Sequence, residues 1–369
     1  MKLEFVATCT PGLEKISIRE LKEKFGIKAQ ILHKGALIFK GSEKHIYELN
    51  YLAKTLHRIV ILLGKAKVES LEEIYNITKE IEYSQFILPE QTFAVKAKRS
   101  GKHEFTSIDI ASVVGQAIID SYMNSKKKRL KVNLSYPDIR FLCELCEKSF
   151  WFGLDTTGES LHKRWYRKYS FITSLRSTIA YSMAMLCELK QNKSFHDPMC
   201  GTGMIPIEAF HFLSQKPNKY RSFAFEKFYW LNLENFEKLK NSYKENKVEA
   251  LILASDKNSK VVKLAKQNAL FGEAQQIKFF VADATKIKLC SQIICTDLPY
   301  GIRLRKVNLK KLYNMFFENL KANSNFEKLV FITAKRCLKF LPKPFPFELK
   351  EFYDLNYGEI KARIFVCKN

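Results

Sequence analysis

The sequence lacks an apolar run long enough to cross a membrane. A spanning helix needs about 20 consecutive, mostly apolar residues, and the apolar stretches at residues 59–63 and 251–254 are far shorter. No secretory signal peptide opens the sequence either. These absences argue against a membrane or secreted protein, and we expect a cytoplasmic protein without a membrane partner.

A framework of paired cysteines is absent too. The nine cysteines are an odd number and are scattered through 369 residues, which is typical of reduced thiols in the cytosol. Cys143 and Cys146 have the spacing of a zinc knuckle, but a zinc site normally needs four ligands and no second pair lies at a suitable distance. We therefore expect neither disulfides nor a bound metal.

Acidic residues are few relative to basic ones. The chain has 38 Asp and Glu against 62 Lys and Arg, which gives a formal net charge of +24. This surplus favours a polyanionic partner such as nucleic acid and predicts salt-sensitive binding. The hydrophobic content of 46% excludes a disordered chain, and 369 residues suffice for two or three domains with cores of their own.

The amino-terminal half is predicted to contain two α+β units. A strand and a helix that ends at Gly26 open the chain. Two strands, a helix and another strand follow, which completes the βαββαβ order of a ferredoxin-like unit. A strand at residues 92–97 and a helix at residues 108–122 indicate the second unit. We assign residues 1–65 and 66–155 to these two domains, and residues 156–190 to a basic linker and helix.

Basic residues gather in the loops of the second unit and in the linker. A single charge run is usually a solvated face, but two runs in a chain of this charge favour nucleic acid. The linker at residues 161–169 interleaves cations with aromatic rings, which suits phosphate contacts and base stacking but also suits packing on a neighbouring domain. The candidate nucleic-acid-binding residues are Lys98, Arg99, Lys102, His103, Lys126, Lys127, Lys128, Arg129, Lys163, Arg164 and Arg167.

Strands and helices alternate from residue 191 to residue 369, which predicts a parallel α/β sheet of Rossmann type. Residues 211–250 are too long for a simple crossover and are predicted to form an insertion. Residues 347–353 and 362–367 are predicted to close the sheet as a pair of strands. The expected parallel strands lie at residues 194–197, 251–256, 278–282, 292–297 and 328–333.

A glycine-containing loop follows the first of these strands. Gly201 and Gly203 allow the backbone to pass close to a ligand, and the helix that begins near Thr202 offers free amide groups. In an open parallel sheet, ligands bind at such strand ends. Asp197 and Pro198 precede a single Gly-Thr-Gly, which departs from the dinucleotide pattern and argues against a nicotinamide enzyme.

Acidic residues end the next two strands. Asp256 is suited to a ribose diol, and Asp283 can accept a hydrogen bond from an adenine amine. Each acid alone is explained more readily as a helix cap. Three acids at three successive strand ends, with Asp197 as the first, are harder to explain as caps, and they predict a nucleoside cofactor.

Asp297, Leu298, Pro299 and Tyr300 follow a fourth strand. An exocyclic amine conjugated to a purine ring is a poor nucleophile, and acceptors that hold its protons draw the nitrogen lone pair out of conjugation. The Asp297 carboxylate and the Leu298 carbonyl can serve as these acceptors, while Pro299 fixes the turn and Tyr300 can stack on the base. Methyl transfer to the amine then requires mainly positioning.

The order DPMCGTG, ASD, VADA and DLPYG resembles the class I S-adenosylmethionine methyltransferases that modify exocyclic amines. Residues 97–107 and 154–164 resemble the signatures of a THUMP domain. Enzymes of this combined family methylate the N2 amine of guanosine in structured RNA, with S-adenosylmethionine as cofactor. The resemblance implies that the amino-terminal domains hold RNA, and that Asp297, Pro299 and Tyr300 contact the target base. The implied cofactor contacts are Asp197, Pro198, Cys200, Gly201, Thr202, Gly203, Asp256, Lys257, Asp283 and Ala284.

The RNA substrate follows less directly from the sequence. Residues 221–228 resemble the bacterial large-subunit rRNA enzymes, which makes 23S rRNA the main expectation. Asp297-Leu298-Pro299 stands where those enzymes commonly have Asn-Pro-Pro, and this departs toward the tRNA enzymes that act on the acceptor stem. A DNA adenine methyltransferase and an inert RNA-binding protein are the remaining alternatives. We expect a monomer.

Overall fold

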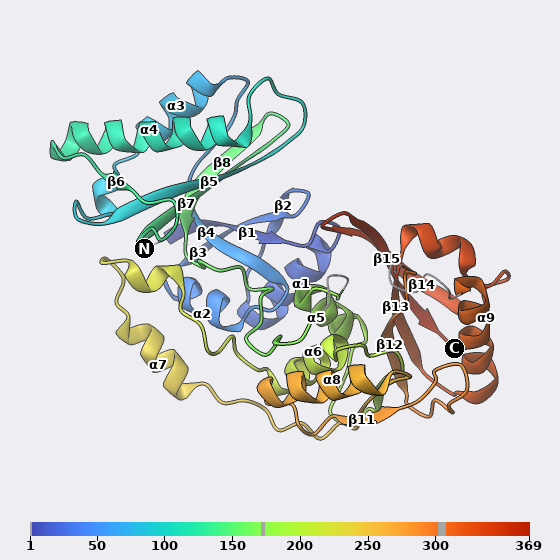
Figure 1. The fold of residues 1–369 in the computed structure, drawn as a ribbon. Helices are drawn as coiled ribbons and strands as arrows, with labels where there is room; N and C mark the ends of the chain where they lie inside the picture. Colours follow the sequence, from blue (N-terminus) through green and yellow to red (C-terminus); the bar gives the residue numbers. More distant parts are fainter. Residues whose placement is uncertain (1, 171–173, 302–307) are drawn as a thin grey trace.

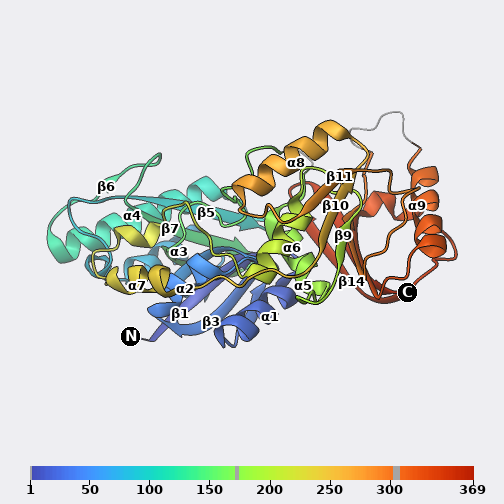
Figure 2. The ribbon, with the colours of Figure 1, turned by 90° about the horizontal axis from the view of Figure 1, so that it is seen from below.

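The computed structural model describes residues 2–170, 174–301 and 308–369. These residues form two lobes, each built on one sheet. Figure 1 shows the amino-terminal lobe, coloured from blue to green, beside the carboxy-terminal lobe, coloured from yellow-green through orange to red. In the view from below in Figure 2 the two lobes lie end to end. None of the described helices is both long and apolar enough to cross a membrane.

The amino-terminal lobe has an eight-stranded sheet in the order β2-β3-β1-β4-β8-β7-β5-β6. The central strand β4 pairs antiparallel with β1 on one side and with β8 on the other, so the two predicted α+β units share one sheet. The predicted boundary between residues 65 and 66 falls inside β4. The strands are β1 (Lys2–Cys9), β2 (Gln30–His33), β3 (Ala36–Ser42), β4 (Leu56–Lys67), β5 (Thr92–Ser100), β6 (Lys131–Val132), β7 (Ile139–Cys146) and β8 (Ser149–Asp155).

The helices of this lobe pack their apolar sides on the sheet and form one core with it. Sequence signals fix their ends: α1 ends at Gly26, which adopts a left-handed φ of 67°, and Thr106 and Asp109 form a capping box at the start of α4. The other face of the sheet carries a smaller apolar cluster around Trp151. The helices are α1 (Glu14–Phe25), α2 (Lys44–Leu52), α3 (Leu71–Lys79), α4 (Ser107–Lys126) and the 3-10 helix η1 (Tyr83–Gln85).

The carboxy-terminal lobe has a seven-stranded sheet in the order β11-β10-β9-β12-β13-β15-β14. The first five strands are parallel, and β15 runs antiparallel to both β13 and β14. Strand order reverses at β9, which lies between β10 and β12, and such a switch point is where ligands bind in open α/β sheets. The strands are β9 (Phe195–Asp197), β10 (Ile252–Asp256), β11 (Lys278–Val281), β12 (Ile293–Asp297), β13 (Lys328–Ala334), β14 (Glu348–Tyr357) and β15 (Ile360–Lys368).

Helices connect these strands and form the core together with the sheet. Every strand predicted from residue 191 onward is present, with ends that differ by one or a few residues from the expected ones. The helices of this lobe are α5 (Ser177–Leu186), α6 (Met204–Ser214), α8 (Ser259–Phe271), α9 (Leu309–Asn323) and the 3-10 helix η3 (Lys335–Phe340).

The predicted insertion lies between α6 and β10 and packs on the other lobe. It contains the 3-10 helix η2 (Ala224–Lys227) and α7 (Glu234–Ser242), and α7 lies next to α2 in Figure 1. Phe225 and Phe236 belong to the amino-terminal core, and their ring centroids lie 5.5 and 6.1 Å from that of Tyr47 on α2. This segment therefore joins the lobes through apolar contacts.

Candidate active site

The loop after β9 is shaped by its glycines. Gly201 and Gly203 have left-handed φ angles of 52° and 86°, which side chains rarely adopt. A Cβ atom at Gly203 would also lie 3.2 Å from the Cβ of Ala265. The backbone therefore favours glycine at both positions, and the close approach of Ala265 adds a steric reason at Gly203. Helix α6 begins directly after Gly203, at Met204.

Asp197 ends β9 and is buried beneath this loop. Its Oδ1 accepts hydrogen bonds from the Met199 amide at 3.1 Å and from the Thr296 hydroxyl at 2.8 Å. Burial raises the pKa of Asp197 well above its usual range, the two hydrogen bonds oppose the rise, and the charges of Asp297 and Asp256 add to it. Three carboxyl groups thus gather at the switch point.

The acids that end the next two strands also bind backbone amides. Asp256 accepts from the Gly201 amide at 3.2 Å and from the Asn258 amide at 2.9 Å, so it ties β10 to the glycine loop. Burial alone would raise the pKa of Asp283, but hydrogen bonds from the Thr285 amide and hydroxyl, at 2.9 and 2.7 Å, lower it. Both carboxylates accept hydrogen bonds from backbone amides of the turns that follow their strands, as expected of capping residues.

The remaining predicted cofactor residues adjoin these acids in the chain. Pro198, Cys200 and Thr202 are buried within the glycine loop, Lys257 is exposed after β10, and Ala284 is buried. The Ala284 carbonyl accepts a hydrogen bond from Asn319 on α9 at 2.9 Å.

Asp297, at the end of β12, faces the same cavity as the glycine loop. This cavity has a volume of about 160 Å³ and is lined by Ser174, Leu175, Asp197, Met199, Cys200, Gly201, Thr202, Met204, Ile205 and Asp297. The Asp297 Oδ1 atom is buried and has no hydrogen-bond partner among the described residues. Burial raises the pKa of Asp297 to about 7, and the Tyr300 hydroxyl opposes the rise. An unpartnered buried acceptor at a cavity wall is the arrangement expected where a ligand donates hydrogen bonds.

Three partners hold the turn that follows Asp297. The Leu298 amide donates to the Ile332 carbonyl at 3.0 Å, the Tyr313 hydroxyl donates to the Pro299 carbonyl at 2.9 Å, and Arg336 donates to the Tyr300 carbonyl at 3.1 Å. Tyr300 itself is buried, and its hydroxyl lies 3.0 Å from the hydroxyl of Tyr357 on β14. Whether its ring stacks on a base stays a prediction.

Comparison with known families accounts for this order of parts. Three family profiles match in series: the RlmL ferredoxin-like domain at residues 4–60, the THUMP domain at residues 68–155 and the RMKL-like methyltransferase domain at residues 164–358. The third match alone covers more than half of the chain. This chain belongs to the RMKL-like methyltransferase family. The resemblance found in the sequence and the predicted fold class are thereby confirmed.

Curated relatives of this methyltransferase are named as RNA guanine-N2 or large-subunit rRNA enzymes. A tRNA (guanine(6)-N2)-methyltransferase of Methanocaldococcus jannaschii is 37% identical and covers 98% of this chain and 99% of its own. An enzyme of the same name from Archaeoglobus fulgidus is 38% identical over 90% of this chain and 83% of its own. Ribosomal RNA large subunit methyltransferase K/L of Buchnera aphidicola is 26% identical over 89% of this chain and 50% of its own.

Solved structures share the whole fold of the methyltransferase. A possible methylase from Clostridium difficile 630 has a TM-score of 0.89 at 25% identity and covers 100% of this chain and 98% of its own. SMU.472, solved in complex with SAH, has a TM-score of 0.86 at 22% identity and covers 99% of this chain and 97% of its own.

The predicted RNA-binding residues of the methyltransferase form separate groups. Lys98, Arg99 and Lys102 are exposed at the end of β5, and His103 beside them is half-buried. The second group, residues 126–129, is exposed at the end of α4. Because β6, which follows that group, pairs with the first residues of β5, the two groups lie about 25 Å apart along this strand.

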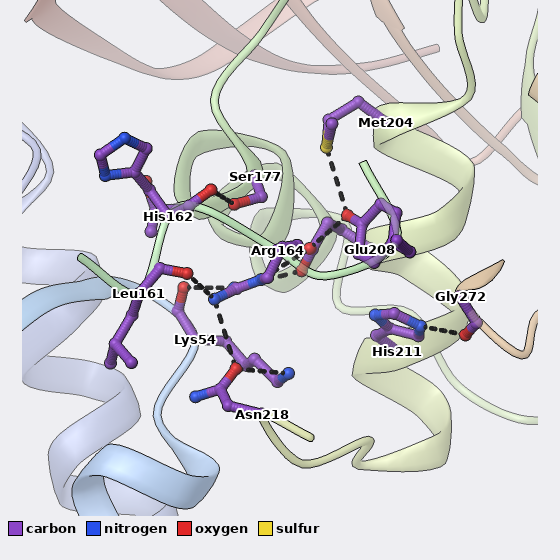
Figure 3. A network of polar contacts seen from close by, with 12 residues as sticks. Lys54, Leu161, His162, Arg164, Ser177, Met204, Glu208, His211, Asn218 and Gly272 are labelled. Atoms are coloured by element: carbon purple, nitrogen blue, oxygen red, sulfur yellow. Dashed lines mark hydrogen bonds and ion pairs between the residues drawn. The ribbon is translucent and has the colours of Figure 1, made fainter. Parts of the chain in front are cut away.

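The structure contradicts the prediction that Arg164 binds RNA. Its side chain is 1% exposed and forms an ion pair with the buried Glu208 on α6, with Nε and Oε1 3.0 Å apart. Figure 3 shows the surrounding network, in which Arg164 also donates to the Leu161 carbonyl and, at 2.9 Å, to the Lys54 carbonyl. Part of the basic linker is therefore packed between the lobes. Packing on a neighbouring domain was the alternative that the sequence left open for this linker.

The other two linker candidates are accessible to different extents. Lys163 is exposed and pairs with Glu159 at 2.8 Å, whereas Arg167 is half-buried and donates to the Ser174 carbonyl at 3.3 Å. No group of three or more side chains suited to a metal ion occurs in the part of the chain that the structure describes.

Sequence reasoning missed several residues that shape the site. Thr296 supports Asp197, Tyr313 supports Pro299, and Tyr357 supports Tyr300. Thr296 directly precedes Asp297 in the same strand. The alternation of side chains along a strand could therefore have indicated that Thr296 lies near Asp197. Tyr313 and Tyr357 lie in other elements, and no spacing in the sequence links them to the turn.

Proposed function

We propose that this methyltransferase transfers the methyl group of S-adenosylmethionine to the exocyclic N2 amine of a guanosine in tRNA. The observation that carries the proposal is the unpartnered Oδ1 of Asp297 in a cavity shared with the glycine loop. Family membership and the names of the full-length relatives support the reaction.

The residues around the cavity fit a cationic nucleoside cofactor. The negative charges of Asp297 and Asp256 add to the burial that raises the pKa of Asp197, and a sulfonium with an amino group would relieve this repulsion. The glycine loop would lie against the cofactor, with Asp256 and Asp283 toward its ribose and adenine. When bound, S-adenosylmethionine supplies an electrophilic methyl group on sulfur.

The target base would occupy the Asp297 side of the cavity. Asp297 in its ionised form accepts a hydrogen bond from the N2 amine and turns the nitrogen lone pair toward the methyl carbon. When the amine is methylated, the Asp297 carboxylate would accept the proton that the nitrogen releases. Tyr313 and Tyr357 contribute by holding the turn in place, because they bond to Pro299 and Tyr300.

Sequence identity supports tRNA over rRNA as the substrate. The tRNA-modifying relatives are 37% and 38% identical to this chain, whereas the rRNA K/L relative is 26% identical. The name of the tRNA relatives gives guanine 6 as their target, and we propose the same position here. The expectation of 23S rRNA is the alternative, because relatives of both kinds match.

The domain division at residues 1–65, 66–155, 156–190 and 191–369 belongs to the same proposal. The first two family matches fall within the first two divisions, and the third, at residues 164–358, spans most of the last two. The residues assigned to cofactor and RNA, other than Arg164, are proposed on the geometry described above.

Labelled methyl transfer tests the proposal. Purified protein is incubated with labelled S-adenosylmethionine and three RNAs: an unmodified tRNA transcript with guanosine at position 6, the same transcript with adenosine there, and unmodified 23S rRNA. We expect labelled N2-methylguanosine from the first transcript alone. Label in 23S rRNA alone would overturn the choice of substrate, and methyladenosine as the labelled product would overturn the reaction.

A further inference from the structure

A second cavity lies at the joint between the linker and the insertion. It has a volume of about 260 Å³ and lies between residues 159–168 of the linker and residues 218–221 of the insertion. Arg164 of the linker and Asn218 of the insertion are two of the lining residues, and a hydrogen bond of 3.4 Å joins them. Figure 3 shows the two residues on separate segments of the chain. The cavity is separate from the one that contains Asp297.

Some of the cations around this cavity are neutralised and others are not. Lys163 pairs with Glu159 at 2.8 Å, and Lys219 pairs with Glu245 at 2.5 Å. The other basic lining residues besides Arg164 are Arg167, Lys168 and Arg221. Among the described residues, none of these three has a carboxylate within ion-pair distance. The cavity wall therefore keeps an excess of positive charge.

The two arginines are held in place by backbone carbonyls. Arg221 donates to the carbonyls of Glu159, Ser160 and Lys163, the last two at 3.5 Å, and Arg167 donates to the Ser174 carbonyl at 3.3 Å. The Nε atoms of both arginines are buried without a hydrogen-bond partner among the described residues. Burial lowers the pKa of Arg221 to about 10. Fixed guanidinium groups with unused donors are the groups that bind phosphate most strongly.

Further cations extend from the cavity toward the amino-terminal sheet. Burial lowers the pKa of Lys96 on β5, and the charges of Arg58, Arg140 and Lys98 lower it further, so these four groups lie within electrostatic range of one another. The charge of Arg58 also acts on Arg221. Positive charge thus continues from the exposed end of β5 to the cavity.

Cations also extend from the cavity toward the active site. Burial is the main cause of the lowered pKa of Arg167, and the charge of Arg176 adds to it. The charge of Arg176 also lowers the pKa of Tyr357, whose hydroxyl contacts that of Tyr300. Ser174, whose carbonyl binds Arg167, lines the cavity that contains Asp297. The cationic cavity therefore lies between the RNA-binding lobe and the candidate catalytic turn.

We propose that Arg167, Lys168 and Arg221 form a binding site for the phosphodiester backbone of the RNA strand that carries the target guanosine. This inference rests on the proposed function, because it takes RNA as the substrate. Arg164 and Asn218, which line the cavity, also donate hydrogen bonds to backbone carbonyls of the amino-terminal lobe, including that of Lys54, so the shape of the site depends on the docking of the two lobes. The site would give the enzyme a second RNA contact near the active site, in addition to the contacts of the amino-terminal lobe.

Charge reversal at Lys168 tests this site. Lys168 is exposed, and its side chain has no partner among the described residues, so Lys168→Glu should leave the fold intact. Lys15→Glu, an exposed lysine in the first turn of α1, is the matched control with the same change of charge. The affinity of the tRNA transcript is measured by gel shift without cofactor at several salt concentrations, and S-adenosylmethionine binding is measured by calorimetry.

We expect Lys168→Glu to weaken tRNA binding at least about tenfold. The slope of log binding constant against log salt concentration should decrease by about one in magnitude. Cofactor affinity should stay within about twofold of wild type. Arg221→Gln should weaken tRNA binding in the same direction, provided that thermal unfolding shows a folded variant. Lys168→Glu binding tRNA as tightly as Lys15→Glu would overturn the site. If Lys168→Glu weakens binding while wild type forms no N2-methylguanosine, the phosphate site stands and the proposed reaction fails.

Discussion

Burial raises the pKa of Asp297 to about 7, so the charge of its carboxyl group changes within the physiological range. The proposed reaction needs the ionised form as acceptor. We therefore expect kcat to rise with pH through about 7 and then to level off. Asp297→Asn keeps a carbonyl acceptor but does not titrate, and its kcat should show no rise in this range. The measurement is single-turnover methylation of the tRNA transcript between pH 5.5 and 9.

Asp297→Ala provides the reference for this profile because it has no acceptor. Its rate should fall about a hundredfold or more at every pH, while cofactor affinity stays nearly unchanged. An inflection near pH 7 that persists in Asp297→Asn would assign the titration to another group.

The same carboxyl group should affect stability. Folded Asp297 keeps its proton to a higher pH than it does in the unfolded chain, where the pKa is about 3.9. The folded state thus binds more protons between about pH 4 and 7, and this contribution to stability falls as pH rises through that window. Asp297→Asn removes the effect, so its Tm relative to wild type should increase from pH 5 to pH 8. A difference in Tm that stays constant over this range would contradict the raised pKa.

Helix α9 contacts the candidate catalytic turn through the hydroxyl group of Tyr313. Tyr313 donates to the Pro299 carbonyl and lies 2.7 Å from the hydroxyl of Thr333. Tyr313→Phe leaves these buried partners unsatisfied, which should cost about 1–3 kcal/mol of unfolding free energy. Because the turn carries Asp297, we also expect kcat to fall at least about fivefold without a matching rise in the KM for tRNA.

Tyr243→Phe is the control for this prediction. The Tyr243 hydroxyl donates to the Gln215 carbonyl at 2.7 Å, in the insertion and away from the turn. Its loss should lower stability by a similar amount and leave kcat unchanged. Equal effects of both variants on kcat would show that Tyr313 acts through general stability alone.

The buried ion pair between the linker and α6 should matter more than the exposed ion pair beside it. Both side chains of Arg164 and Glu208 are buried, so Arg164→Gln leaves Glu208 as an uncompensated charge and should cost about 3–5 kcal/mol. Lys163→Gln breaks the exposed pair with Glu159 and should cost less than about 1 kcal/mol. Denaturant unfolding of both variants measures the difference, and equal costs would contradict the burial of Arg164.

Much of the element order could be predicted from the sequence. The strands of the carboxy-terminal sheet end at Asp197, Asp256 and Asp297, and parallel topology alone brings these ends together. Periodicity and caps located the helices of the first lobe, such as α4 behind Thr106. These features are local, so spacing along the chain suffices to find them.

The joint between the lobes could not be predicted in the same way. Arg164 and Arg167 are three residues apart in one cationic run, yet Arg164 is buried in an ion pair with Glu208, whereas Arg167 is half-buried and donates to a backbone carbonyl. Their environments depend on α6 and on residues 218–221, which follow 40 to 60 residues later. Charge patterns do not reveal which cation finds a buried partner.

The two lobes should depend on each other for folding. Phe223, Phe225 and Phe236 belong to the carboxy-terminal half of the chain but pack in the core of the amino-terminal lobe. Expressed alone, residues 156–369 would expose these rings, and we expect an aggregated fragment that elutes in the void volume of a sizing column. Coexpression with residues 1–155 should recover a soluble complex. A monomeric, soluble fragment would show that the insertion folds back on its own lobe.

The place of these aromatic rings also has a consequence for synthesis on the ribosome. Strands β1 to β8 leave the exit tunnel first, but the last rings of their core, at Phe225 and Phe236, are translated about 70 to 80 residues after β8 ends. At a typical rate of about 5–20 residues per second, the nascent first lobe waits several seconds with an open apolar groove. That groove is where a chaperone would act during translation, and slower translation through this stretch would prolong its exposure.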